Sequence, residues 1–391
     1  MHRSAVSLFK LLLLWLITSC NAVAAPVIIP SPPQLAALAY LLMDADSGMI
    51  LVEHNGGQRL PPASLTKIMT SYVAATELAQ GNIKLDDQVD ISVTAWRMGG
   101  SRMYVQEGTK VSLQDLLRGV IVQSGNDASV ALAEHIAGSE SAFADMMNQQ
   151  GKILGMKDTQ FVNATGWPDE NHYTNAVDMA LLTVALIKDY PDHYRMYAEK
   201  YFSYNNIRQP NRNSLLWRDN SVDGVKTGHT DAAGYCLVIS ATRQGMRLIS
   251  VLMGAKNEEV RATESQKLLT YGFRFFETHR LYDAATSLSN HRIWGGVDDS
   301  IDLGLHEEVV ITIHRGMKEE LSVKMEIDNV IEAPFKAGTQ FGNLIISLDD
   351  EVIYEAPLTA LKSMPESGFF SNSWDDIHLF FLQLFGLDTL H

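Results

Sequence analysis

Two consecutive prolines, Pro61 and Pro62, fix where a helix can begin in the run PPASLTKIMT, which spans residues 61–70. Proline cannot continue a helix, but it suits the first turn of one. The apolar residues that follow recur at helical spacing and share one face: Leu65, Ile68 and Met69. We therefore predict that a buried helix begins in this run.

Ser64 and Lys67 are three residues apart in that predicted helix, so their side chains lie on the same side and can share one small site. A serine hydroxyl is a poor nucleophile until a neighbouring base takes its proton. A lysine can be that base where burial and nearby cations lower its pKa. Because S-x-x-K is expected roughly once by chance in a chain of this length, the pair by itself does not establish a catalytic site.

Two further short motifs follow the first, Ser124-Gly125-Asn126 and Lys226-Thr227-Gly228. The Ser-Gly-Asn motif separates two apolar runs, so it can be a loop that lowers a hydroxyl and an amide into a cleft, although the same letters are ordinary turn chemistry. Lys226 lies in a β-rich segment, where Gly228 would let another backbone or a ligand approach closely. All three motifs in this order are a much rarer coincidence than any one of them.

Strand patterns before and after the motifs predict two β-hairpins. The predicted strands cover residues 39–44, 49–53, 222–230, 235–241 and 246–253. Turn residues join the first two strands at Asp46-Ser47-Gly48 and the last two at Gln244-Gly245, and the strand with Lys226 is expected at an edge. The Ser64 helix follows the first hairpin directly, so its start should lie against the sheet that this hairpin opens. Further helices are predicted after a Ser112 cap and over 178–187.

From residue 301 onward the pattern changes to short β-like segments, separated by glycine or by Asp and Asn turns. These segments cover residues 309–313, 321–327, 341–348 and 351–354. Their spacing predicts a small all-β sandwich without a catalytic cluster. We expect it to begin near residues 276–285 and to serve as a spacer or docking module.

The first 24 residues have the pattern of a secretory signal peptide. Positive charges precede a short apolar core at 11–17, and Ala22-Val23-Ala24 supplies small residues for cleavage, so the mature chain would work outside the cytoplasm. The alternative is a lipobox at 17–20, in which Cys20 would be lipidated. If the leader is removed, Cys236 is the one cysteine left, so no internal disulfide is expected.

The last stretch, residues 368–390, has bulky apolar residues at three- and four-residue intervals, opposite a polar, acidic face. An amphipathic helix of this kind can lie in a membrane interface, and packing against the β domain or a partner is the alternative. It is neither long enough nor uniformly apolar enough to span a bilayer.

The chain of 391 residues is long enough for two domains, each with its own core. Its formal net charge is −15, and no cluster of lysine and arginine compensates for it, which argues against a nucleic-acid partner. No metal-site pattern occurs, because His229, His306 and His314 have no ligand partner at useful spacing. We therefore expect neither a metal nor another cofactor.

Taken together, the three motifs resemble those of the penicillin-binding, active-site-serine family. The form found here, Ser-Gly-Asn with Lys-Thr-Gly-His-Thr, is similar to the low-molecular-mass D-alanyl-D-alanine carboxypeptidases of peptidase family S11, over essentially the whole chain. The resemblance implies an α/β (α+β) fold, with an antiparallel sheet flanked by helices, then the all-β sandwich and the terminal helix. The implied division is a signal peptide (1–24), a catalytic domain (25–278), a β-sandwich domain (279–366) and a membrane-anchoring helix (367–391).

The resemblance also implies a role for each motif residue. Ser64 would attack the carbonyl between the two terminal D-alanines of a peptidoglycan stem pentapeptide, Lys67 would take its proton, and Ser124 would relay a proton to the leaving amine. Backbone N–H groups of Ser64 and His229 would form an oxyanion hole. Arg261 has the alternative of a charge on a solvated helix face. The implied substrate-binding residues are Asn126, Lys226, Thr227, Gly228, His229 and Arg261.

The implied enzyme is periplasmic, is attached to the outer face of the cytoplasmic membrane through its terminal helix, and is acylated by β-lactams. Three alternatives stay open. A β-lactamase would be expected to have Ser-Asp-Asn as its second motif and an asparagine four residues after its deacylating glutamate, whereas this chain has Gly125 and, after Glu170, Thr174. A muropeptide endopeptidase uses the same motifs. A non-catalytic penicillin-sensing or cell-wall-binding module would need a damaged triad or a transmembrane signalling segment.

Overall fold

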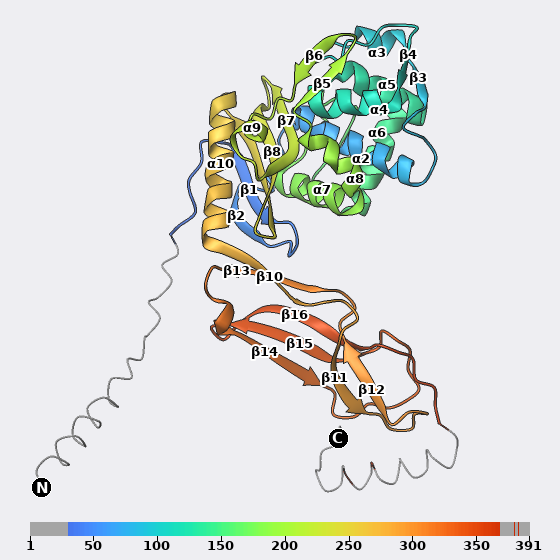
Figure 1. Cartoon of the computed structure of the whole chain (residues 1–391), viewed down its shortest axis with the longest axis vertical. Helices are drawn as coiled ribbons and strands as arrows, with labels where there is room; N and C mark the ends of the chain where they lie inside the picture. The colour runs from blue at the N-terminus through green and yellow to red at the C-terminus, as the bar shows by residue number, and fades with distance from the viewer. Residues whose placement is uncertain (1–29, 368–378, 380–381, 383–391) are drawn as a thin grey trace, which may run out of the picture. The chain divides into compact units, whose positions relative to one another are not determined.

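The computed structural model describes residues 30–367, 379 and 382 of the chain (Figure 1). The predicted signal peptide (1–24), the Cys20 lipobox and almost all of the predicted terminal helix therefore lie outside the described residues. Among the residues that are described, no helix combines the length and the apolar character that crossing a bilayer requires.

A five-stranded antiparallel sheet forms the centre of the N-terminal part, in the strand order β2-β1-β9-β8-β7. Its strands are β1 (Ala39–Asp44), β2 (Ile50–His54), β7 (Val222–Thr230), β8 (Gly234–Arg243) and β9 (Met246–Ala255). Both predicted hairpins are confirmed, and β1 pairs with β9, so distant parts of the chain meet in one sheet. Among the described strands, β7 pairs with β8 alone, which confirms the edge position predicted for the strand with Lys226.

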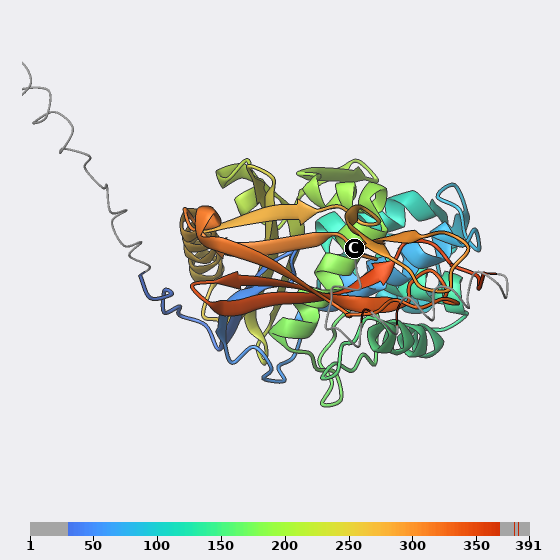
Figure 2. The same cartoon turned by 90° about the horizontal axis from the view of Figure 1, so that it is seen from below.

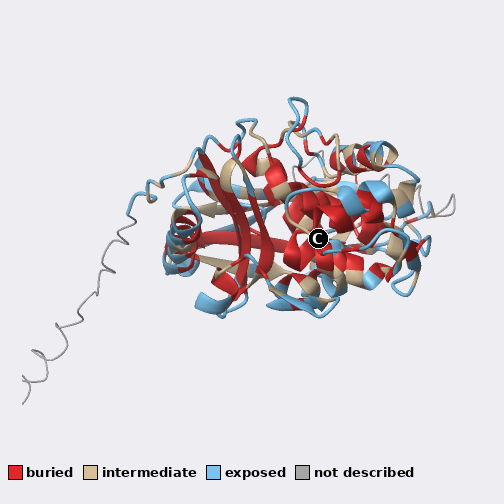
Figure 3. Ribbon diagram, turned by 90° about the horizontal axis from the view of Figure 1, so that it is seen from above, coloured by how far each residue is buried: buried red, intermediate tan, exposed pale blue. Residues whose placement is uncertain are grey.

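Helices cover both faces of this sheet (Figure 1). Successive side chains of a strand point to opposite faces, so Leu41 joins the core on the side of the helical lobe, and Leu42 joins the core beneath α10 (Glu258–Phe275). Both leucines are fully buried. Figure 3 shows the sheet and the inner helices coloured as buried. The sheet is therefore the middle layer between two apolar cores.

The helical lobe lies between β2 and β7 in the sequence. Its long helices are α2 (Thr66–Ala79), α5 (Asn126–Ala137), α6 (Glu140–Ile153) and α7 (Ala176–Asp189). Its shorter elements are η1 (Ala63–Leu65), β3 (Gln88–Asp90), α3 (Val93–Arg97), β4 (Lys110–Ser112), α4 (Leu113–Arg118), η2 (Gly119–Gln123), α8 (Pro191–Tyr194), η3 (Arg195–Ala198), β5 (Tyr201–Tyr204) and β6 (Ile207–Pro210). The short helix α9 (Leu215–Arg218) also precedes β7, but its Leu215 and Leu216 join the core beneath α10. The predicted Ser112 cap is confirmed, because its Oγ accepts a hydrogen bond from Asp115 N at 3.1 Å.

The residues after α10 form two further sheets, β10-β13 and β11-β12-β16-β15-β14. Their elements are β10 (Phe276–Tyr282), β11 (Ser287–Arg292), β12 (Ser300–Gly304), β13 (Val309–His314), η4 (Lys318–Glu320), β14 (Leu321–Ile327), β15 (Gln340–Leu348) and β16 (Glu351–Ala360). Ile311 of β13 shares a buried cluster with Leu344 and Ile346 of β15, so the two sheets pack against each other. In the view from below, their orange and red strands lie along one another (Figure 2).

β12 was not predicted from the sequence, and neither were β10 and β11. Both strands carry polar or charged residues at most positions, FETHRLY in β10 and SLSNHR in β11, so neither shows an apolar run. Pairing with β13 and with β12 makes them strands. The domain boundary after residue 278 stays a prediction, and α10 ends at Phe275 with β10 directly after it.

Replacing Leu42 by alanine should lower the free energy of unfolding by about 2–5 kcal/mol, because the change leaves a cavity in a fully buried site beneath α10. Urea denaturation of the purified protein measures this loss. Leu85→Ala is the matched control, since Leu85 is 43% exposed and its truncation should cost less than about 0.5 kcal/mol. Equal losses in the two variants would contradict the role assigned to Leu42.

Candidate active site

Ser64 lies at the start of the predicted helix, in the turn η1 that leads into α2. Ala63 has a φ of +46°, which residues with a side chain rarely adopt, so the chain bends sharply just before the serine. Two glycines let other segments reach this bend. A Cβ atom on Gly228 of β7 would lie 3.3 Å from Ser64 N, and one on Gly166 would overlap the Ala63 carbonyl oxygen. The edge strand and a loop of the helical lobe therefore both pack against the Ser64 backbone.

The Lys67 side chain lies within hydrogen-bonding distance of three oxygen atoms. Its Nζ atom is 3.1 Å from Ser64 Oγ, 2.7 Å from Asn126 Oδ1 and 2.5 Å from the Thr165 carbonyl oxygen. The last two oxygens only accept hydrogen bonds, so both take N–H hydrogens from Lys67. When the amine is neutral, the position left for its lone pair faces the Ser64 hydroxyl.

Burial and a neighbouring positive charge lower the pKa of Lys67. The residue is 1% exposed, and desolvation together with the charge of Arg212 lowers the pKa of Lys67 to about 7. The carboxylates of Asp127 and Glu140 oppose this shift. A substantial fraction of the Lys67 side chains is therefore neutral near pH 7 and can accept a proton.

Ser124 is placed by an unusual helical turn. Residues Gly119–Gln123 form a π-helix, and Ser124 at its end has a left-handed conformation with a φ of 65°. Its Oγ atom is buried and has no hydrogen-bond partner within the described part of the chain. Single π-turns and left-handed residues other than glycine both recur at functional sites. The Ser124 hydroxyl is thus available to a molecule bound next to Ser64.

Asn126 connects Lys67 to the loop at residues 99–101. Its Nδ2 donates to the Gly99 carbonyl oxygen at 2.8 Å, and its backbone N–H donates to the Ser101 carbonyl oxygen at 2.7 Å. Because its Oδ1 also accepts a hydrogen bond from Lys67, the Asn126 side chain positions both the lysine and the loop at residues 99–101. This dual contact explains why an amide, with a donor and an acceptor at one end, suits the position.

The edge strand β7 carries the third motif. Lys226 and Thr227 are buried, whereas His229 is exposed and its ring lies 4.0 Å from the ring of Tyr235, centroid to centroid. Arg261, in the first turn of α10, is 5% exposed and donates from Nη1 to the Gly228 carbonyl oxygen at 3.4 Å. Arg261 therefore does not lie on a solvated helix face, which was the alternative for this residue.

Positive charge gathers at this end of the sheet. Burial and then the charges of neighbouring cations lower the pKa of Lys226 well below its usual value. The neighbours responsible are Lys67, Arg212 and Arg261. Although the chain has a net charge of −15, two guanidinium groups, Arg212 and Arg261, line the cavity here, together with the carboxylates of Asp231 and Glu258. The guanidinium groups can pair with an anionic ligand.

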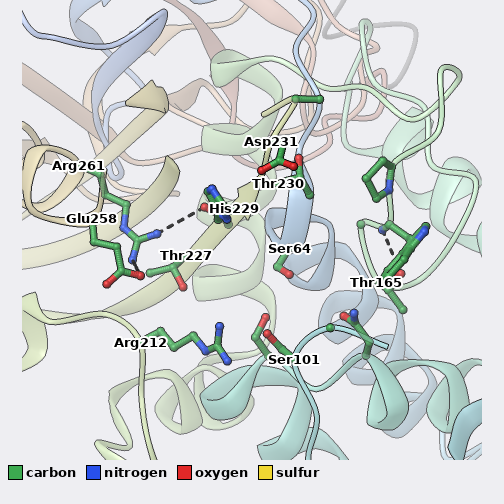
Figure 4. Close-up of a pocket in the computed structure, with 18 residues that line it drawn as sticks. Ser64, Ser101, Thr165, Arg212, Thr227, His229, Thr230, Asp231, Glu258 and Arg261 are labelled. Atoms are coloured by element: carbon green, nitrogen blue, oxygen red, sulfur yellow. Dashed lines mark hydrogen bonds and ion pairs between the residues drawn. The ribbon is translucent and has the colours of Figure 1, made fainter. Parts of the chain in front are cut away.

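One cavity of about 770 Å³ opens between these elements (Figure 4). The predicted site residues that line it are Ser64, Ser124, Asn126, Thr227, Gly228, His229 and Arg261. Lys67 and Lys226 lie buried beside it, the first bonded to Ser64 and the second to the Thr227 carbonyl oxygen. The structure thus brings every predicted site residue to one place. Within the described residues, no group of His, Cys, Asp and Glu side chains is placed to hold a metal ion.

The sequence analysis missed other residues of this cavity, among them Arg212, Thr165 and Trp167. Arg212 lies in PNRN at 210–213, which reads as an ordinary turn, and no local pattern marks it. Thr165 acts through its backbone carbonyl, which every residue has. These contributions depend on position in space, so the sequence contains no direct signal for them.

Comparisons with known proteins agree with this geometry. Residues 26–257 match the family model for D-alanyl-D-alanine carboxypeptidase, peptidase family S11. Residues 276–366 match the model for the penicillin-binding protein 5 C-terminal domain. The chain is similar to the crystal structures of penicillin binding protein 5 from Haemophilus influenzae, with a TM-score of 0.84 and 44% identity, over 86% of this chain and 100% of that one.

Curated relatives have the same range of similarity. The chain is 44% identical over 362 residues to the D-alanyl-D-alanine carboxypeptidase DacC of Escherichia coli (strain K12), a match that covers 90% of each chain. A D-alanyl-D-alanine endopeptidase of the same organism is 31% identical over 283 residues, which is 69% of this chain and 89% of that protein. The active-site geometry, both family models and these relatives together show that the chain belongs to the S11 family of D-alanyl-D-alanine carboxypeptidases.

Proposed function

We propose that this chain is a serine-type D-alanyl-D-alanine carboxypeptidase, which removes the terminal D-alanine from peptidoglycan stem pentapeptides and so regulates cell-wall cross-linking. The observation that carries the proposal is the 3.1 Å approach of Lys67 Nζ to Ser64 Oγ beside a cavity that Arg212 and Arg261 line. Membership of the S11 family supports the same activity.

The reaction begins when neutral Lys67 takes the Ser64 proton and Oγ attacks the carbonyl carbon between the two D-alanines. Backbone N–H groups of Ser64 and His229 donate to the developing oxyanion, each worth about 3 kcal/mol. Ser124 passes a proton to the leaving amine as the C–N bond breaks and takes one from Lys67. D-Alanine leaves, and the rest of the peptide stays on Ser64 as an ester.

In the second step, water attacks the ester carbonyl and Lys67 again takes the proton. The C–O bond to Ser64 breaks, and Ser64 recovers its hydrogen. Since Lys67 can be reprotonated and deprotonated near pH 7, one residue serves both steps. A β-lactam would enter at the same point, because its strained amide also offers a carbonyl carbon to Ser64.

The arginines that line the cavity explain why the enzyme would cleave at the C-terminal residue of a peptide. The leaving D-alanine carries a free carboxylate, and the side chains of Thr227, Arg212 and Arg261 line the cavity on the side of β7. Asn126 and the exposed edge of β7 can hydrogen-bond the peptide backbone, as in strand addition. A substrate without that carboxylate would lose its ion pairs with the exposed Arg212 and the buried Arg261, which costs binding energy.

The Ser64→Ala variant tests the chemistry. D-Alanine release from a pentapeptide that ends in D-Ala-D-Ala should fall at least about 1,000-fold, and covalent labelling by a fluorescent penicillin should disappear, because no other group can form the ester. Ser214→Ala is the matched control and should behave like the native protein. Labelling of Ser64→Ala would contradict the assignment of the nucleophile.

The same assay separates the alternatives. Labelling without D-alanine release would favour a penicillin-sensing or cell-wall-binding module, rapid turnover of penicillin would favour a β-lactamase, and cleavage of cross-linked dimers faster than of pentapeptides would favour a muropeptide endopeptidase. Release of D-alanine with slow penicillin turnover is the result we expect.

The pH dependence of acylation tests the role of Lys67. The neutral amine is the base, so the second-order rate constant for a fluorescent penicillin should rise with pH through about 7. Arg212→Gln removes a charge that lowers the pKa of Lys67, so the midpoint should move to higher pH. Arg208→Gln is the control, since its guanidinium lies 3.9 Å from the Tyr201 ring centroid and is outside the cavity. A midpoint of Arg212→Gln at or below the native value would contradict this account.

We propose a periplasmic location, with attachment to the outer face of the cytoplasmic membrane through the predicted helix at 367–391. The apolar face read from the sequence supports this proposal. Deletion of residues 368–391 should move the protein from the membrane fraction to the soluble fraction after cell lysis. If the truncated protein still sediments with membranes, and Cys20→Ala releases it, lipidation at Cys20 is the anchor instead.

A further inference from the structure

Trp167 is a large apolar residue that the catalytic steps leave without a role. Its side chain lines the catalytic cavity, yet the residue is 48% exposed. It directly follows Gly166, whose backbone lies against the Ala63 carbonyl beside Ser64. The Cα atom of Trp167 is about 3.8 Å from that of Gly166, as for any two consecutive residues. The indole is therefore attached to the chain one residue after the glycine that packs against the Ser64 backbone.

The backbone that presents this indole is held firmly. Asn163 Oδ1 accepts hydrogen bonds from the backbone N–H groups of Thr165, Gly166 and Trp167 at 3.1, 2.8 and 3.1 Å. Asn163 Nδ2 donates to the Trp167 carbonyl oxygen at 3.0 Å, so one asparagine closes the turn from both sides. The same turn presents the Thr165 carbonyl to Lys67. Trp167 is thus preorganised relative to the catalytic lysine.

The indole packs against the backbone of two glycines, Gly99 and Gly100. Cβ atoms on Gly99 and Gly100 would lie 3.5 and 3.4 Å from its six-membered ring, so the ring packs beside this bare stretch of backbone. Asn126, which holds Lys67, also binds the Gly99 carbonyl. The ring therefore has a fixed backing on one side, while part of its surface stays open to the cavity. An ordered, half-exposed aromatic ring is a low-entropy contact surface for apolar ligand groups.

The positions of the cavity residues around Ser64 indicate which part of a substrate would meet this ring (Figure 4). Thr165 lies on one side of Ser64, and Thr227, Arg212 and Arg261 lie on the other. The leaving D-alanine carries the carboxylate, so it occupies the side with the arginines. The acyl part of the substrate, which stays on Ser64, must then extend toward the turn that carries Trp167.

We propose that Trp167 is a specificity-determining residue, whose indole forms an apolar shelf for the group attached to the acyl side of the reacting carbonyl. It favours stem peptides with a long aliphatic side chain before the D-alanines, and β-lactams with an aromatic or aliphatic side chain. This inference rests on the proposed carboxypeptidase function. A single aromatic contact of this kind changes the relative reactivity of two ligands by about 3- to 10-fold.

Two penicillins that share one reactive ring separate this contact from the chemistry. Benzylpenicillin carries an aromatic side chain, and 6-aminopenicillanic acid carries none. In Trp167→Ala, the ratio of their second-order acylation rate constants should fall about 3- to 10-fold, with the constant for 6-aminopenicillanic acid nearly unchanged. Trp167→Phe should keep most of the native ratio, because the aromatic face remains.

Trp217→Ala is the matched control, since Trp217 is another partly exposed tryptophan, 39% exposed, and does not line the cavity. Its ratio should equal the native one. Equal losses for both penicillins in Trp167→Ala would overturn the proposal, because the residue would then only hold the turn that supports Lys67. If the native protein neither reacts with these penicillins nor releases D-alanine, the proposed function itself is wrong, and so is the role proposed for Trp167.

Discussion

The active site depends on one contact, the approach of the Lys67 amine to the Ser64 hydroxyl at 3.1 Å. Lys67 is surrounded by acceptors that take two of its hydrogens, the Asn126 amide oxygen and the Thr165 carbonyl oxygen, so its lone pair is directed at Ser64. A lysine at its usual pKa would be charged and could not act as a base. Burial and the nearby charge of Arg212 bring its pKa to about 7, so the proton can leave.

The fold supplies this arrangement by bringing three separate segments to the first turn of α2. The edge strand β7 and the turn with Gly166 can approach only because glycine stands at each contact. A π-helix ends at Ser124 and turns its hydroxyl toward the same cavity. Ala63 and Ser124 both have a positive φ, a conformation that costs energy in residues with a side chain and that recurs at functional sites. Stability and reactivity are thus linked at the same residues.

The cations that line the cavity contrast with the negative net charge of the whole chain. The chain as a whole is acidic, with a net charge of −15, yet burial and nearby cations lower the pKa of Lys67 and of Lys226 beside the cavity. Screening confines each surface charge to about 10 Å, whereas buried charges interact more strongly. The carboxylate of a peptide end therefore responds to the local cations and not to the net charge. The apolar ring of Trp167 lines the same cavity.

The sequence by itself determined the elements and the chemistry of the three motifs. Short apolar runs joined by turn residues predicted both hairpins of the central sheet, and a Ser112 cap predicted a helix start. Ser64 with Lys67 predicted a base beside a nucleophile, because all these signals are local. Only the tertiary structure brings the charge of Arg212 near Lys67 and places Trp167 and Ser64 in the lining of one cavity. It also decided that polar β10 is a strand, since partners in space, not neighbours in sequence, supply these contacts. Burial, which sets the pKa of Lys67, is likewise a property of the folded chain alone.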